Sequence, residues 1–236
     1  MNFLSIDTSV YSTSVAVTQD YQLKAELTSN ESQSHSEKII EHIDKVLNLS
    51  QMTLQDMDCF VCTFGPGSFT GLRIGASTIK GFAQIFDKPI IGISVLEAMA
   101  YSVPNKGGLL CPMIDAQRDQ VYSGWYRWEE QKVTRLLEEG IYSVEELLRR
   151  ADKQSETLIF LGNGLGKFKG KESLEKRENT VLLPEMFYPI KASHLGALAV
   201  EKYRQQEDCY TWQNFEPKYF RKSQAEIQRE KRMKGE

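Results

Sequence analysis

The sequence predicts an α/β fold of two similar lobes, and three observations lead to this prediction. The first half of the chain alternates strand-like runs with amphipathic helical runs in the order βββαβαβ. A Pro-Asn-Lys-Gly-Gly linker follows at residues 104–108. The second half again places its strands before its helices, as a duplicated unit would. We therefore expect an N-terminal lobe at residues 1–103 and a C-terminal lobe at residues 104–236.

Hydrophobic periodicity predicts the individual elements of both lobes. Runs that are apolar or alternate with period two indicate strands, and apolar residues three and four apart indicate helices. In the first lobe the predicted strands span residues 2–8, 13–18, 21–28, 58–64 and 90–93, and the predicted helices span residues 35–49, 70–86 and 95–101. In the second lobe the predicted strands span residues 109–114, 121–127 and 158–161, and the predicted helices span residues 143–150 and 193–203.

Composition and charge exclude several classes of protein. The chain has 236 residues, 41% hydrophobic and 26% charged, which is enough for a core without a metal or disulfide. A net charge of −3 argues against a chain that binds nucleic acid by itself through a broad basic face. Residues 221–236 carry six Lys or Arg against three Glu and predict a solvated basic tail, with contact to RNA held by a larger complex as the alternative.

The four cysteines do not predict a metal or redox centre. Cys59 and Cys62 have CxxC spacing, but they lie in a predicted strand, where residues three apart point to opposite faces. Unpaired thiols and the lack of a signal peptide lead us to expect a cytoplasmic protein. The sequence holds no apolar run of about 18 residues, so no membrane span is expected.

A glycine-rich loop at residues 65–71 joins a buried strand to the start of a helix. Free amides and the helix dipole make such a place suited to anions, and Gly65, Gly67 and Ser68 are the candidate phosphate contacts. The loop lacks the Gly-Lys-Ser/Thr of a Walker motif. A tight strand-to-helix turn explains the same residues, and the sequence leaves both interpretations open.

Two carboxylates follow strands at corresponding places in the two lobes. Asp7, with Thr8 and Ser9, ends the first strand, and Asp115 ends the strand at 109–114. Facing each other across a cleft, they could hold the Mg²⁺ of a nucleotide, although Asp at a strand end is also a common turn former. Residues 162–164, Gly-Asn-Gly, could receive an adenine ring, but a plain turn is favoured.

The helix at 70–86 is apolar on nearly two sides. One stripe, expected to face the core, consists of Leu72, Ala76, Ile79, Ala83 and Phe86. A second stripe consists of Gly71, Ile74, Thr78, Gly81, Phe82 and Ile85. Either other elements of the chain cover this second stripe or it meets a partner protein, and Gly71 with Gly75 would permit the close approach of another helix.

Catalytic constellations are missing from the sequence. The three histidines are scattered, and neither GxSxG nor HExxH occurs. We therefore assign no catalytic residue and no metal ligand.

Four segments together resemble the TsaB (YeaZ) family. They are MNFLSIDTS at the start, GPGSFTGLRIG at 65–75, IDAQRDQVY at 114–122 and EPKYFR at 216–221. The resemblance implies a two-lobed actin/hexokinase-like (ASKHA, ribonuclease H-like) fold and kinship with TsaD, which binds a metal through an HxxxH pair. Val95 and Met99 stand where those histidines would be, and neither can replace imidazole. Gln117 replaces an Arg that the family usually has, which weakens any nucleotide role of the second lobe.

The resemblance further implies a non-catalytic subunit that works in a complex. Its partners would be TsaD, bound through the N-terminal lobe, and the ATPase TsaE. The complex would add a threonylcarbamoyl group to the adenosine next to the anticodon of ANN-decoding tRNAs, and tRNA would be met only through the complex. Alone, the chain is expected to form a homodimer and to bind no cofactor, with ATP or ADP held at an inter-subunit site. The expected interface residues are Phe69, Gly71, Ile74, Gly75, Thr78, Phe82 and Ile85.

A second hypothesis from a different class is a stand-alone ATP-dependent kinase or transferase of the ASKHA type. It would need Asp7 and Asp115 to hold Mg-ATP and residues 162–164 to hold adenine.

Overall fold

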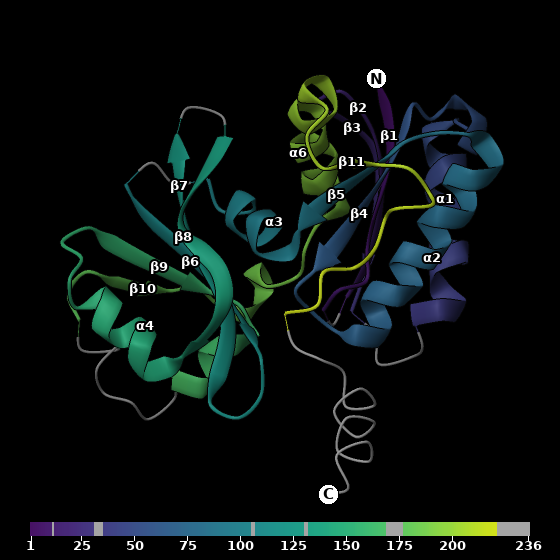
Figure 1. Ribbon diagram of the computed structural model, residues 1–236. Coiled ribbons are helices and arrows are strands. Elements are labelled where there is room, and N and C mark those ends of the chain that lie inside the picture. The colour runs from purple at the N-terminus through teal and green to yellow at the C-terminus, as the bar shows by residue number, and fades with distance from the viewer. Residues whose placement is uncertain (11, 31–34, 105–106, 130–131, 169–176, 221–236) are drawn as a thin grey trace, which may run out of the picture.

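Each lobe is built around one mixed β-sheet (Figure 1). The computed structural model describes residues 1–10, 12–30, 35–104, 107–129, 132–168 and 177–220. Within these residues the first sheet has the strand order β11-β5-β4-β1-β2-β3 and the second has the order β10-β9-β6-β7-β8. The predicted basic tail at residues 221–236 lies outside the described residues.

The same strand order occurs in both sheets. The first three strands of each lobe pair antiparallel as a meander, and the fourth and fifth then add in parallel beside the first. In the first lobe these strands are β1 (Asn2–Asp7), β2 (Thr13–Gln19), β3 (Gln22–Ser29), β4 (Cys59–Gly65) and β5 (Ile90–Ser94). In the second they are β6 (Gly108–Asp115), β7 (Gln120–Glu129), β8 (Lys132–Ser143), β9 (Thr157–Leu161) and β10 (Thr180–Leu182). The predicted duplication of an α/β unit is therefore confirmed.

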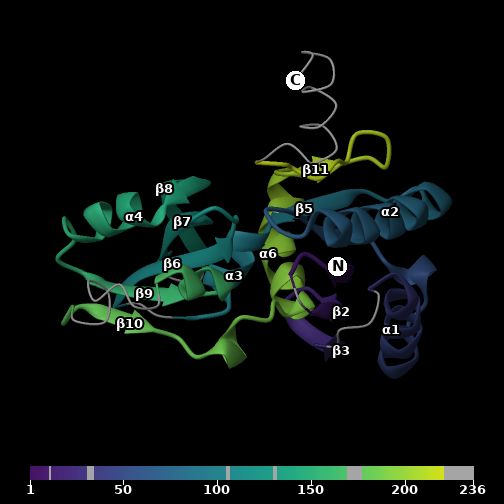
Figure 2. The same ribbon diagram turned by 90° about the horizontal axis from the view of Figure 1, so that it is seen from below.

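Helices cover both faces of the first sheet. One face carries α1 (His35–Ser50) and α2 (Phe69–Phe86), which lie on the outer side of the molecule (Figure 2). The other face carries α3 (Val95–Tyr101) and α6 (Ala192–Gln205). Helix α4 (Val144–Ala151) packs in the second lobe, and short 3₁₀ turns are η1 (Leu54–Asp56), η2 (Asn163–Phe168) and η3 (Glu185–Phe187).

After the second sheet the chain returns to the first lobe. Strand β11 (Cys209–Tyr210) pairs antiparallel with β5, and Gly196 of α6 packs closely on Thr18 of β2. The physical reason is that the inner face of the first sheet is apolar and needs a cover. A boundary at residues 103 and 104 separates the two sheets, but α6 and β11 belong to the body of the first lobe.

One apolar core runs from the first sheet to the second. It joins Phe3 and Ile91 of the first sheet to Leu110 and Ile159 of the second, with α3 and α6 between them. Two indole contacts fix α3 to the second lobe as well: Trp128 stacks on Tyr101 at 4.9 Å, and its Nε1 donates to the Ala100 carbonyl oxygen at 3.3 Å. The two lobes therefore share buried surface rather than meeting only through a linker.

Among the described helices, none combines the length and apolar character needed to cross a bilayer.

Because the core is shared, we expect both lobes to unfold in one transition, and a substitution in the core should destabilise both lobes together. Leu96 on α3 is fully buried in that core, so Leu96→Ala should lower the free energy of unfolding of the whole chain by about 2–5 kcal/mol. Leu49→Ala on the exposed end of α1 is the control and should change it by less than about 0.5 kcal/mol. Denaturant unfolding followed by hydrogen exchange of each lobe measures this, and two separate transitions would contradict it.

Candidate functional site

Asp7 ends β1 as a fully buried carboxylate. Its Oδ1 accepts hydrogen bonds from Ser9 Oγ at 2.6 Å, Thr63 Oγ1 at 2.8 Å and the Ser9 amide at 3.2 Å. Thr63 lies on the neighbouring strand β4, so this carboxylate ties together the ends of two parallel strands. Charge-assisted bonds of this kind are strong, and they hold the Asp7 side chain in place.

The glycine-rich loop packs directly on the end of β1. The Ser68 amide donates to the Ser9 carbonyl oxygen at 2.7 Å, and Thr8 Oγ1 donates to the Gly71 carbonyl oxygen at 2.7 Å. A Cβ added to Gly67 would overlap the Ser9 carbonyl oxygen. Ser68 caps α2 by accepting from the Gly71 amide at 3.2 Å. This geometry supports the interpretation of the loop as a tight strand-to-helix turn.

Gly71 and Gly75 lie on the inner side of α2. A Cβ on Gly71 would overlap the Thr8 carbonyl oxygen, and one on Gly75 would come within 2.7 Å of Thr8 Oγ1. Both glycines are buried against their own lobe. Our expectation that they face a partner helix is therefore wrong: they permit close approach, but the approaching segment is the end of β1 in the same chain.

In the second lobe Asp115 is exposed, unlike Asp7. Its Oδ1 accepts from the Gln117 amide at 2.6 Å and pairs with Lys167 Nζ at 3.4 Å. The Asn163 side chain accepts from the Asp115 amide at 3.0 Å, which fixes η2 against β6. Gly164 is buried tightly against Met113 and Val121, so this glycine serves packing.

Two residue pairs singled out in the sequence lie in apolar surroundings. Val95 and Met99 are buried in the core between the lobes. Cys59 belongs to the core on one side of β4 and Cys62 to the core on the other side, so the prediction that the two thiols point to opposite faces is confirmed. Burial raises the pKa of both thiols above the ordinary value. Within the described residues no group of three or more His, Cys, Asp or Glu is placed to hold a metal ion.

The outer side of α2 is one of the places where the fold leaves a large apolar side chain exposed. Its inner stripe, Leu72, Ala76, Ile79 and Ala83, is buried as predicted. Ile74 and Phe82 are half-buried at the edge of the outer core, and Ile85 is 74% exposed. Helix α1 exposes Ile40 and Leu49 as well, so both outer helices present apolar side chains to solvent.

The C-terminal segment packs against the first turns of α2, a contact that its sequence pattern did not predict. Tyr219 stacks on Phe69 at 4.5 Å and accepts a hydrogen bond from Arg73 Nε at 3.2 Å, while the Arg73 guanidinium lies 3.9 Å from the Phe69 ring. The structure thus brings together two motifs, GPGSFTGLR and EPKYF, that are more than 140 residues apart. Each motif contains an aromatic residue, Phe69 in one and Tyr219 in the other, and this was the one feature of the sequence that could have indicated the contact.

These features define a two-lobed α/β protein of the actin/hexokinase-like class, in which a ribonuclease H-like unit occurs twice. A family model described as TsaD, tRNA N6-adenosine threonylcarbamoyltransferase, matches residues 25–229 of this chain. The chain is 33% identical over 192 residues to the tRNA threonylcarbamoyladenosine biosynthesis protein TsaB of Escherichia coli, covering 78% of this chain and 82% of that protein. It is 31% identical over 163 residues to TsaB of Bacillus subtilis, covering 69% and 71%. The chain therefore belongs to the TsaB (YeaZ) family.

A solved structure from Pseudomonas aeruginosa, described as similar to peptidase YEAZ, has the same fold. Its TM-score is 0.81 at 22% sequence identity, covering 93% of this chain and 99% of that chain.

Two glycines of α2 provide a matched test of this packing. Gly71→Ala should lower the free energy of unfolding by about 1–3 kcal/mol, because the added methyl group overlaps the end of β1. Gly81 has open space around it, so Gly81→Ala should raise the free energy of unfolding by about 0.5–1 kcal/mol through helix propensity. Urea denaturation of both variants checks this, and equal effects would contradict the assigned packing.

Proposed function

We propose that this chain is a non-catalytic scaffold subunit in tRNA threonylcarbamoyladenosine biosynthesis. It docks on TsaD through the outer face of its first lobe and works together with TsaE. The threonylcarbamoyl group is transferred on TsaD to the adenosine next to the anticodon of ANN-decoding tRNAs. The names of the relatives at 31–33% identity support the pathway, and the features of α2 support the mode of action.

The observation that carries the proposal is the exposed apolar side of α2. Ile85 is 74% exposed although the opposite stripe of the same helix is fully packed. Ile74, Thr78 and Phe82 continue this surface toward the start of the helix, where Phe69 stacks on Tyr219. A helix that is apolar on a second side gains free energy when another protein covers that side.

The neighbouring helix α1 lies beside this surface and packs on the same face of the sheet (Figure 2). Its exposed Ile40 and Leu49 are nine residues apart and so lie on opposite sides of α1, which lets one of them extend the surface of α2. Two helices from each protein would form a four-helix contact, and a specific interface needs about 1,200–2,000 Å² in total. In the absence of the partner, the same surface would pair two copies of this chain.

The lack of catalysis is proposed from the residues that stand where TsaD has its metal-binding histidine pair. Val95 and Met99 offer no ligand for a hard or borderline ion, and both are packed in the core. ATP or ADP, in this proposal, binds at an inter-subunit site of the complex and not to this chain alone.

The docking face is tested by adding charge to it. Ile85→Arg should weaken TsaD binding at least about 100-fold, because a charge would be buried in an apolar interface, while the free energy of unfolding stays nearly unchanged. Ile74→Arg should act in the same direction with some loss of stability, since Ile74 is half-buried. Calorimetry or co-purification with TsaD measures the binding.

Gln84→Arg is the matched control, because Gln84 is an exposed polar residue next to Ile85 on the same helix. It should leave TsaD binding within about twofold of the parent chain. Normal complex formation by a folded Ile85→Arg variant would remove α2 from the interface.

The enzymatic alternative is tested on the purified chain with Mg-ATP. The scaffold proposal expects no heat of binding and no tRNA modification without TsaD. Micromolar Mg-ATP binding that is lost in Asp7→Ala would favour a stand-alone kinase or transferase instead.

A further inference from the structure

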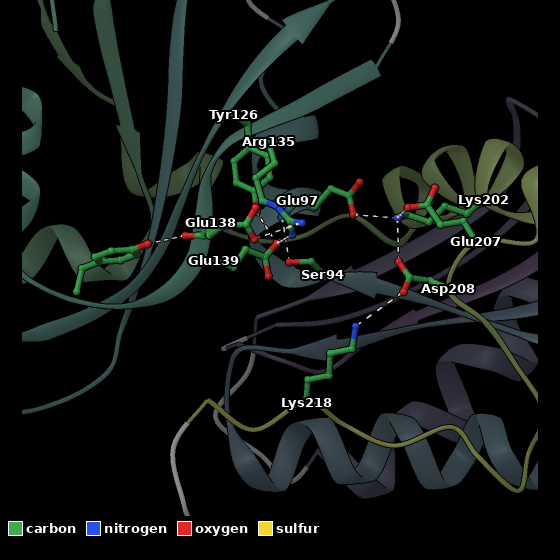
Figure 3. A network of polar contacts seen from close by, with 11 residues as sticks. Ser94, Glu97, Tyr126, Arg135, Glu138, Glu139, Lys202, Glu207, Asp208 and Lys218 are labelled. Carbon is green, nitrogen blue, oxygen red and sulfur yellow. Dashed lines mark hydrogen bonds and ion pairs between the residues drawn. The ribbon is translucent and has the colours of Figure 1, made fainter.

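A cluster of charged side chains centred on Lys202 lies at the rim of the core between the lobes (Figure 3). The Lys202 ammonium on α6 lies 3.1 Å from Asp208, 3.5 Å from Glu97 and 3.9 Å from Glu207. The Lys202 side chain is only 12% exposed. These carboxylates come from α3 and from the turn before β11, so a single ammonium joins three segments of the chain.

Glu97 is the member of this cluster that faces the second lobe (Figure 3). It lies between Lys202 and the pair formed by Glu139 and Tyr126, in which the Tyr126 hydroxyl donates to Glu139 at 2.5 Å (Figure 3). Arg135 of β8 balances Glu139 from 3.9 Å. Burial raises the pKa of Glu97, and Lys202 opposes that rise. For Lys202, burial disfavours the charged form and lowers the pKa, but the surrounding carboxylates outweigh burial and raise the pKa of Lys202 above the ordinary value.

Asp208 also pairs with Lys218 and so joins the cluster to the C-terminal segment, residues 215–220. Lys218 Nζ lies 3.8 Å from Asp208 and 3.9 Å from the centre of the Phe64 ring. The Lys218 amide donates to the Phe64 carbonyl oxygen at 2.7 Å, which fixes the segment on the end of β4. Two residues later Phe220 meets Tyr122 of β7, with ring centres 6.0 Å apart. The segment thus begins on the first lobe and ends on the second.

We propose that the Lys202 cluster and residues 215–220 form one clamp that holds the two lobes in a fixed mutual orientation. Its ion pairs run from Glu97 through Lys202 and Asp208 to Lys218, all on the first lobe, where Glu97 faces the like-charged Glu139 of the second lobe. The C-terminal segment then reaches the second lobe at Phe220. Two-lobed α/β enzymes admit and release ligands by closing and opening. Here the clamp keeps the lobes in a single arrangement, so a partner meets a preset surface.

The burial of Lys202 makes it the strongest point of the clamp. Exposed ion pairs contribute little, because water screens them and their side chains lose entropy. Loss of one member of a buried set has a larger effect, since the remaining charges stay buried without compensation. Without Lys202, the buried Glu97 carboxylate would lose the cation that pairs with it and would be left facing Glu139, which destabilises the contact between α3 and β8.

The clamp is tested on the isolated full-length chain by pulsed electron paramagnetic resonance. Spin labels at Asp44→Cys on α1 and Glu145→Cys on α4, both exposed positions, report the distance between the lobes in a Cys209→Ser background. Dilution with unlabelled protein restricts the signal to distances within one chain. The parent chain should give one narrow distribution, and Lys202→Met should broaden it and speed hydrogen exchange in α3 and β8 on the order of a hundredfold.

Two further variants separate the clamp from a general loss of stability. Adding Glu97→Gln to Lys202→Met should narrow the distribution again, because it removes the carboxylate left without a partner. Lys45→Met, which breaks the exposed pair with Glu41 on α1, should change neither measurement.

If Lys202→Met does not fold, Phe220→Ala decides the question, since Phe220 is half-exposed at the end of the segment. A folded variant that lacks either Lys202 or Phe220 and keeps the narrow distribution would overturn the clamp. Because TsaD is absent from the experiment, this result is independent of the proposed docking.

Discussion

The apolar layer formed by α3 and α6 between the two sheets is the constraint on which the rest of the structure depends. It buries the inner face of the first sheet against the second lobe, so Phe3 and Leu110, more than 100 residues apart, share one core. A core position at 95 or 99 demands an apolar side chain of the right volume, and Val95 and Met99 meet that demand. The same two side chains offer no ligand that suits a hard or borderline metal ion.

Because α3 and α6 cover the inner face of the first sheet, the helices on its outer face are the ones left open to solvent. With α3 and α6 on one side of the first sheet, α1 and α2 remain on the outer side, covered by the sheet only from within (Figure 1). Helix α2 is held there by glycines packed on the end of β1 and by Tyr219 at its first turn. A helix fixed at that end presents its other side as a rigid surface, which lowers the entropic cost of binding a partner.

Local patterns predicted most of the elements but missed the strands β8, β10 and β11, and contacts distant in sequence were beyond their reach. The predicted strands and helices, and the opposite orientation of Cys59 and Cys62, follow from periods of two and 3.6 residues, which depend only on neighbouring positions. The return of α6 and β11 to the first lobe depends on which apolar face still lacks a cover, and periodicity alone does not contain that information. For the same reason the small residues Gly71 and Gly75 indicated a close approach correctly but not the segment that approaches.

The polar groups at the strand ends, like the apolar layer, make most of their described contacts within the chain. In a fold that binds ligands at the carboxyl ends of parallel strands, carboxylates and loop amides supply the contacts. Here the Asp7 Oδ1 atom accepts from Ser9 and Thr63, the Ser68 amide donates to the Ser9 carbonyl, and Asp115 is engaged by Gln117 and Lys167. These bonds fix the two strand ends within the chain itself. The exposed apolar side chains of α2, by contrast, would gain free energy if another surface removed them from water.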